Sequence, residues 1–218
     1  MAPRPGPGTI RYTTADVRRM LHDDQGRRRP LLLWMGRFLA FKHLNLLLQA
    51  IAALRDRTPV RTALLILGGH PGEWEGDHPH TLARDLHITD DVYFAGWRPH
   101  SDLIDGLHCA DLLTAPSVDE PFGLIYLEAM ASGTPVIASA SGGPLGYVTT
   151  NGPHATGWLP APGDLADLVT TIEQALTDPA ELTRRGEAAR RFALDRYSWR
   201  SLTPRYLDIY DRVLAART

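Results

Sequence analysis

The sequence has almost no cysteine or lysine and no long hydrophobic run. Its single cysteine, Cys109, excludes a framework of internal disulfide bonds. No segment approaches the ~18 consecutive apolar residues of a membrane-spanning helix, and the N-terminal MAPRPGPG lacks the apolar core of a secretory signal peptide. We therefore expect a cytoplasmic protein. The net charge of -2 gives no electrostatic indication of nucleic-acid binding.

Lysine is so rare that its one position stands out. The 23 basic residues are Lys42 and 22 arginines. If a coding bias has replaced lysine by arginine wherever either would serve, the position that kept lysine needs a compact ammonium group. The composition therefore marks Lys42 as a candidate functional residue.

Apolar runs alternate with helical periodicity along most of the chain. The 218 residues, of which 44% are hydrophobic, suffice for one buried core. Short apolar runs predict buried strands, and a period of 3.6 residues predicts helices. Strands are expected at 31–36, 61–69, 92–96, 111–116, 135–143 and 157–162, and helices at 14–22, 43–56, 81–87, 101–110, 122–133, 164–177, 179–197 and 198–216. This order predicts an α/β fold, a Rossmann-like parallel sheet of about six strands with helices on both faces.

The end of the first strand carries two cations. Parallel sheets bind their ligands at the carboxyl ends of the strands, and here Gly36 is followed by Arg37 and then by Lys42. Two cations five residues apart can hold a diphosphate from two sides. The alternative is that both are solvated charges at the start of a helix.

A second group of candidate residues lies in EPFGLIYLE, from Glu120 to Glu128. Pro121 suits the first position of a helix, and a helix start with free N–H groups can bind an anion. A carboxylate accepts hydrogen bonds from sugar hydroxyls, which suits both glutamates. The alternative is that they are ordinary helix glutamates. The N–H groups expected to face the ligand are those of Phe122, Gly123 and Leu124.

Residues 119–143, DEPFGLIYLEAMASGTPVIASASGG, resemble the E-x7-E signature of retaining GT-B glycosyltransferases, in particular glycosyltransferase family 4 (group 1). The blocks LLLWMGRFLAFKHLNLLLQAI, ALLILGG, VYFAGW and CADLLTAPS occur in the family's order, and the resemblance covers about residues 25–216. It implies one half of a GT-B fold. That half binds a nucleotide-diphospho-sugar, whose sugar is transferred with retention to an acceptor held by an N-terminal domain.

The resemblance also implies roles for individual residues. Arg37 and Lys42 correspond to the pair that neutralises the donor diphosphate, Glu120 to the carboxylate at the transferred sugar, and Glu128 to the carboxylate at the ribose. Catalysis is implied for Glu120, Arg37 and Lys42, without a metal or other cofactor. Further donor contacts are implied for residues at strand ends and at the helix start, namely Gly36, Gly68, Trp97, Arg98, Pro99, Phe122, Gly123 and Leu124.

The implied organisation has three parts. Residues 1–28 are a flexible tail and linker, 29–197 the donor-binding domain, and 198–218 a C-terminal helix that crosses back to the missing acceptor domain. The chain would then be a hexosyltransferase-type enzyme, incomplete without an acceptor domain or partner subunit, through which it could meet a membrane-associated acceptor. The alternative is a non-catalytic nucleotide-sugar-binding or regulatory subunit.

Several features depart from the family or are interpreted as structural. His43 stands where the family usually has glycine, and Gly146 where it commonly has glutamate. We expect Cys109 to be buried and the arginines at 27–29 to be solvated. The loop that carries His70, Asp77, His78 and His80 is interpreted as solvated, since its spacing fits no metal motif.

Overall fold

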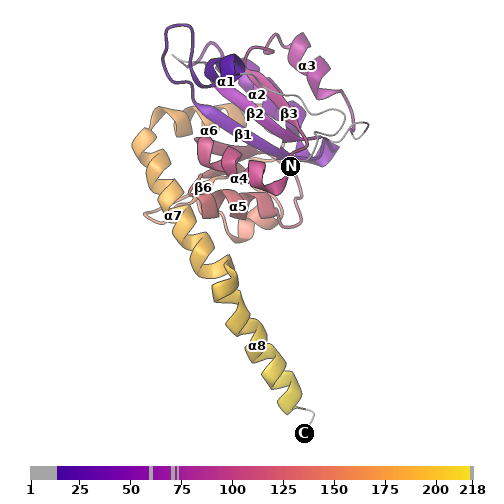
Figure 1. The fold of residues 1–218 in the computed structure, drawn as a ribbon, viewed down its shortest axis with the longest axis vertical. Coiled ribbons are helices and arrows are strands. Elements are labelled where there is room, and N and C mark those ends of the chain that lie inside the picture. Colours follow the sequence, from indigo (N-terminus) through magenta and orange to yellow (C-terminus); the bar gives the residue numbers. More distant parts are fainter. Residues whose placement is uncertain (1–13, 59–60, 70–71, 73, 217–218) are drawn as a thin grey trace.

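The structure, a computed structural model, describes residues 14–58, 61–69, 72 and 74–216. Its centre is a parallel sheet with the strand order β3-β2-β1-β4-β5-β6. Each predicted strand segment contains one of these strands, so the predicted Rossmann-like α/β fold is confirmed (Figure 1). The strands are β1 (Leu31–Gly36), β2 (Ala63–Gly68), β3 (Val92–Gly96), β4 (Leu112–Ala115), β5 (Val136–Ala138) and β6 (Gly157–Trp158). The α-helices are α1 (Thr14–Leu21), α2 (Leu44–Leu54), α3 (Pro79–Asp85), α4 (His100–Cys109), α5 (Leu124–Ser132), α6 (Leu165–Thr177), α7 (Pro179–Tyr197) and α8 (Trp199–Ala215).

The strand order places β1 beside β4. The chain runs from β1 to β2 and β3, and then crosses back through α4 to β4 on the other side of β1. Right-handed crossovers place α2 and α3 on one face and α4 and α5 on the other. In agreement, α2 packs against α3 and α6, whereas α5 packs against α4 and α7. The order therefore reverses between β1 and β4, the place where open α/β sheets bind ligands.

Strand β1 is the centre of the core because both faces of the sheet are covered. Leu31, Leu32, Leu33 and Trp34 are fully buried. The strand pairs in register with β2 over its whole length, from Leu31 to Gly36. A strand covered on both faces is apolar at every position, which explains the uninterrupted LLLWM.

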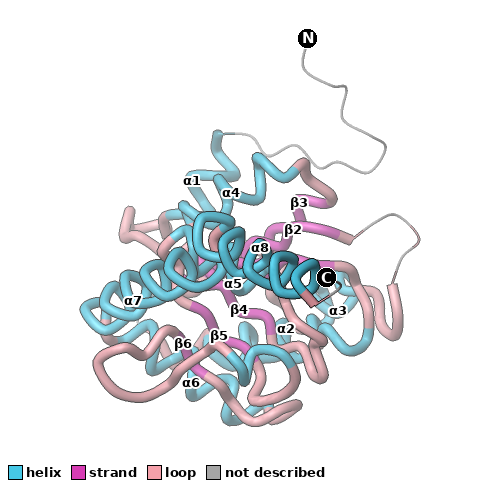
Figure 2. The backbone as a smooth tube through the Cα atoms, turned by 90° about the horizontal axis from the view of Figure 1, so that it is seen from below, coloured by secondary structure: helices cyan, strands magenta, loops and turns pink. Residues whose placement is uncertain are grey.

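Helix α8 projects from the rest of the molecule. It follows α7 after Ser198 and runs outward to the C-terminal end (Figure 1), and it is foreshortened in the view from below in Figure 2. It contains no buried residue, and Trp199 at its start is 78% exposed. Of the helices in the described part of the chain, none is long and apolar enough to cross a membrane.

Two predictions about single residues are wrong. Cys109 is exposed at the end of α4, because Gly106 and Leu107 face the core there and leave Cys109 on the outer side. Arg29 is buried rather than solvated, since its guanidinium is held by backbone carbonyls and by Asp91.

Candidate functional site

The loop after β1 brings Lys42 to Glu120. Lys42 ends a short 3₁₀ turn, Ala40–Lys42, and its Nζ forms an ion pair with the carboxylate of Glu120, 78 residues further along the chain. The side chains are only 15% and 10% exposed. The Phe41 carbonyl accepts a hydrogen bond from Val118 N–H at 2.8 Å, which joins the two loops. The lysine and the first glutamate of the predicted site therefore lie together.

The glycine pair after β5 holds the backbone of Glu120. Gly143 N–H donates to the Glu120 carbonyl at 2.7 Å. Gly142 has a φ of 66°, and a Cβ there would lie 2.4 Å from the same carbonyl oxygen. Only glycine allows this conformation and this approach together. Ser141 in the same loop adds a contact, because its Oγ accepts from Asp119 N–H at 3.0 Å.

Helix α5 begins later than Pro121 predicts. Its first residue is Leu124, and Gly123 precedes it in the left-handed region with φ 81°. The prediction that Pro121 opens the helix is therefore wrong, because the backbone turns at Gly123 before it becomes helical. Within the described chain, neither Gly123 nor Leu124 donates a backbone hydrogen bond. The start of α5 thus offers free N–H groups, although from a shorter helix than expected.

The carbonyls just before α5 accept hydrogen bonds from Tyr147, a residue that the sequence analysis did not single out. Tyr147 is buried, and its hydroxyl donates to the carbonyls of Phe122 and, at 3.1 Å, Gly123. Burial raises the pKa of Tyr147, so its hydroxyl keeps the proton it donates. Tyr147 lies 24 residues after Gly123, and no sequence pattern connects the two positions.

Glu128 makes no contact with the pair formed by Lys42 and Glu120 in the described structure. It lines a groove of about 390 Å³ between α5 and the junction of α7 and α8, with mainly apolar neighbours. Its role at a ribose stays a prediction. The neighbours in the groove include Leu124, Tyr197, Trp199 and Leu202.

The remaining predicted residues lie at or just after the ends of β1, β2 and β3. Arg37 is exposed directly after β1. Gly68 packs against the end of β1, where a Cβ would lie 2.0 Å from the Gly36 carbonyl oxygen. After β3, Trp97 is 63% exposed and Arg98 Nε donates to the Ala95 carbonyl at 3.1 Å. The last of the group, Pro99, caps the start of α4.

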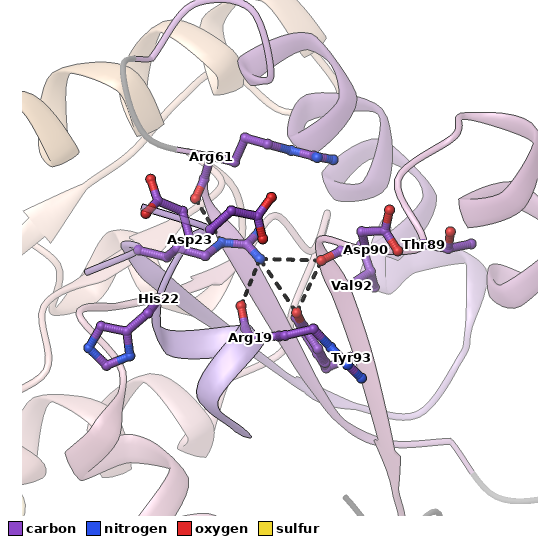
Figure 3. Close-up of a pocket in the computed structure, with 10 residues that line it drawn as sticks. Arg19, His22, Asp23, Arg61, Thr89, Asp90, Val92 and Tyr93 are labelled. Atoms are coloured by element: carbon purple, nitrogen blue, oxygen red, sulfur yellow. Dashed lines mark hydrogen bonds between the residues drawn. The ribbon is translucent and has the colours of Figure 1, made fainter. Parts of the chain in front are cut away.

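A cluster of charged residues occupies the opposite ends of the strands. There Arg19, His22, Asp23, Asp90 and Tyr93 line a cavity of about 400 Å³ (Figure 3). The Arg29 guanidinium lies between these residues. It donates hydrogen bonds to four backbone carbonyls and to the Asp91 carboxylate. This bonding indicates a structural role. The carbonyls belong to Arg19, Arg61, Thr62 and Asp90.

The conformation of His43 leads to a prediction about stability. His43 joins the 3₁₀ turn to α2 in the left-handed region, with φ 48° and ψ 37°. That conformation costs a non-glycine residue about 1–2 kcal/mol, partly offset by the roughly 0.5–1 kcal/mol of extra backbone entropy that glycine loses. We expect His43→Gly to raise the free energy of unfolding in urea by about 0.5–1 kcal/mol.

The control for this substitution is His108→Gly, on the exposed side of α4. There glycine should lower the free energy of unfolding by a few tenths of a kcal/mol, since His108 lies in the last turn of α4 and histidine is only slightly better than glycine in a helix. A loss of stability for His43→Gly as well would show that the His43 side chain makes a compensating contact.

Comparison with known proteins identifies the family. The family "Glycosyl transferases group 1" matches residues 20–192. The chain is 35% identical over 209 residues to the D-inositol 3-phosphate glycosyltransferase of Corynebacterium aurimucosum, covering 94% of this chain and 47% of that protein. It is 37% identical over 180 residues to the glycogen synthase of Mycobacterium tuberculosis, covering 82% and 42%. The chain thus spans about half the length of the curated relatives it matches.

Solved structures share the fold. The sucrose-phosphate synthase of Thermosynechococcus elongatus matches with a TM-score of 0.75 and 32% identity, covering 86% of this chain and 46% of that one. The Anabaena protein HepE in complex with UDP matches with a TM-score of 0.75 and 23% identity, covering 84% and 49%. The fold is therefore that of GT-B glycosyltransferases, as predicted, and the chain belongs to the group 1 family of glycosyl transferases.

Proposed function

We propose that this chain is the donor-binding half of a retaining glycosyltransferase and holds a nucleotide-diphospho-sugar at the carboxyl ends of β1 and β4. The observation that carries the proposal is the ion pair between the single lysine, Lys42, and Glu120 beside the start of α5. Membership of the family supports transfer of a sugar from an activated donor. The curated relatives include a D-inositol 3-phosphate glycosyltransferase and a glycogen synthase.

In this proposal the cations stabilise the departing diphosphate. Lys42 and Arg37 would meet it from the loop after β1, and the N–H groups at the start of α5 would meet it from the other side. Donors fixed in place before the reaction stabilise developing charge without reorganisation, which is often the largest catalytic contribution. The proposal includes no metal ion, since side-chain cations supply the positive charge.

Glu120 has a separate role in the proposal, because Lys42 can exchange partners. In the structure Lys42 and Glu120 neutralise each other in a largely buried place. When a donor binds, the ammonium group would turn to the diphosphate, and Glu120 would accept hydrogen bonds from the transferred sugar. Both charges then keep a partner, as charges removed from water must.

An acceptor-binding domain is the partner that we propose for α8. The exposed side chains of this helix include Trp199, Leu207, Tyr210 and Leu214. Such a row of apolar groups indicates an interaction surface. The chain covers about half of its curated relatives, and in this proposal a domain like the other half of those relatives would cover the helix. The acceptor domain would supply the other wall of the catalytic cleft.

The proposal is tested by calorimetry with UDP, pyrophosphate and uridine. UDP is the first nucleotide to test because it is bound in one of the structures that share the fold. We expect UDP to bind and pyrophosphate to compete with it. Glu128→Ala should weaken UDP binding about tenfold, the effect of losing a charge-assisted hydrogen bond, and should leave pyrophosphate binding unchanged.

The matched control is Glu187→Ala, an exposed glutamate on α7. It should bind all three ligands like the wild type. Equal losses for UDP and pyrophosphate in Glu128→Ala would contradict the ribose role. Absence of both UDP and pyrophosphate binding in the wild type would contradict the donor site itself.

A further inference from the structure

Tyr147 contacts two consecutive peptide groups before α5. It follows the 3₁₀ turn Gly143–Gly146 after β5, and only 2% of its surface is exposed. Its hydroxyl lies within hydrogen-bonding distance of the Phe122 carbonyl and 3.1 Å from the Gly123 carbonyl. The hydroxyl has one hydrogen, which the two carbonyls share.

Because each carbonyl shares a planar peptide with the next N–H group, this contact also fixes the direction of two N–H groups. In a trans peptide the C=O and N–H bonds point in opposite directions, and no peptide bond in the described chain is cis. The Phe122 carbonyl belongs to the same peptide as Gly123 N–H, and the Gly123 carbonyl to the same peptide as Leu124 N–H. When Tyr147 holds both carbonyls, both N–H groups point away from it.

We propose that Tyr147 is a positioning residue of the diphosphate site, which acts by aiming the N–H groups of Gly123 and Leu124 at the ligand. Successive N–H groups that point to one side form a concave anion site. Their free state in the described chain fits this role. The inference rests on the proposed function, because it assigns the ligand of these groups to the donor diphosphate.

The contribution of the Tyr147 hydroxyl can be tested separately from that of its ring. The Tyr147 ring packs against those of Phe122 and Tyr197, at centroid distances of 5.7 and 6.1 Å. Phenylalanine would keep this packing and remove only the hydroxyl. Tyr126 offers a matched comparison for the hydroxyl alone. It is also buried, and its ring packs against Gly123, but its hydroxyl donates to the Ala115 carbonyl at 2.5 Å rather than to the 122–124 segment.

The experiment compares Tyr147→Phe with Tyr126→Phe. Both variants are titrated with pyrophosphate in a calorimeter, and their melting temperatures are measured. We expect Tyr147→Phe to weaken pyrophosphate binding about five- to tenfold, the effect of one misaligned hydrogen bond or more. Tyr126→Phe should bind like the wild type, although both variants lose stability. Wild-type affinity in a folded Tyr147→Phe would overturn the inference, because a purely structural hydroxyl changes stability alone.

An NMR titration of the wild-type protein tests the inference without any substitution. In ¹⁵N-labelled protein, the amide resonances of Gly123 and Leu124 should be among those that shift most when pyrophosphate is added. Pyrophosphate binding without a shift of these two amides would overturn the role of Tyr147 and leave the donor site intact. If the wild type binds neither pyrophosphate nor UDP, the proposed function itself fails.

Discussion

Replacing Asp91 with alanine is expected to lower the free energy of unfolding by about 3–5 kcal/mol, the usual cost of removing one partner of a buried ion pair. The Asp91 side chain is 3% exposed and accepts from Arg29 Nη2 at 2.6 Å. Its second oxygen is paired with Arg61. Without Asp91 the buried guanidinium of Arg29 keeps its carbonyl contacts but loses the carboxylate that neutralises it.

Urea unfolding followed by circular dichroism measures this effect. The control is Asp90→Ala, at the neighbouring exposed position, which should change stability by less than about 0.5 kcal/mol. The affinity of folded Asp91→Ala for UDP should equal that of the wild type, because the cluster lies at the ends of the strands opposite the candidate site. Similar losses for Asp90→Ala and Asp91→Ala would contradict the account of the cluster.

The second large effect is expected at the pair formed by Lys42 and Glu120. Lys42→Ala should weaken pyrophosphate binding at least tenfold, since a charge-assisted contact contributes about 1.5–3 kcal/mol. Glu120→Gln should act in the opposite direction and strengthen pyrophosphate binding several-fold. The reason is that the free protein no longer has to break the ion pair, and no carboxylate then repels the bound anion.

Calorimetry on both variants and on the double variant closes a thermodynamic cycle. In the Lys42→Ala background, Glu120→Gln should keep only the part of its benefit that comes from the removed charge repulsion, since no ion pair remains to be broken. A sugar nucleotide distinguishes the two roles of Glu120. Its affinity should increase less than that of pyrophosphate in Glu120→Gln, because the substitution removes the carboxylate that accepts hydrogen bonds from the sugar. Weaker pyrophosphate binding by Glu120→Gln would contradict competition between Glu120 and the ligand for Lys42.

The fold could be predicted from the sequence because its strands and helices carry strong local patterns. The apolar run of β1 and the helical period of α2 are visible without tertiary information. Ordered motifs also predicted the elements that carry Lys42 and Glu120. What brings these two side chains together is the strand order, which places β1 beside β4. No spacing along the chain contains that information.

Other features depend on contacts between distant residues and could not be predicted. Arg29 and Asp91 are 62 residues apart, so the run at 27–29 resembles any solvated group of arginines. The start of α5 depends on a backbone turn at Gly123, and a proline two residues earlier predicted a different boundary. Tyr147 reaches the same turn from the segment after β5.

The adjacency of β1 and β4 has a consequence for fragments of this protein. Lys42 and Glu120 are separated in the sequence by α2, β2, α3, β3, α4 and β4. A chain cut in the α3–β3 connection would therefore place Lys42 on one piece and Glu120 on the other. Neither piece alone would contain the whole site. A ligand that contacts both pieces would favour their reassociation. Donor binding and reassembly of the cut chain would therefore be linked equilibria.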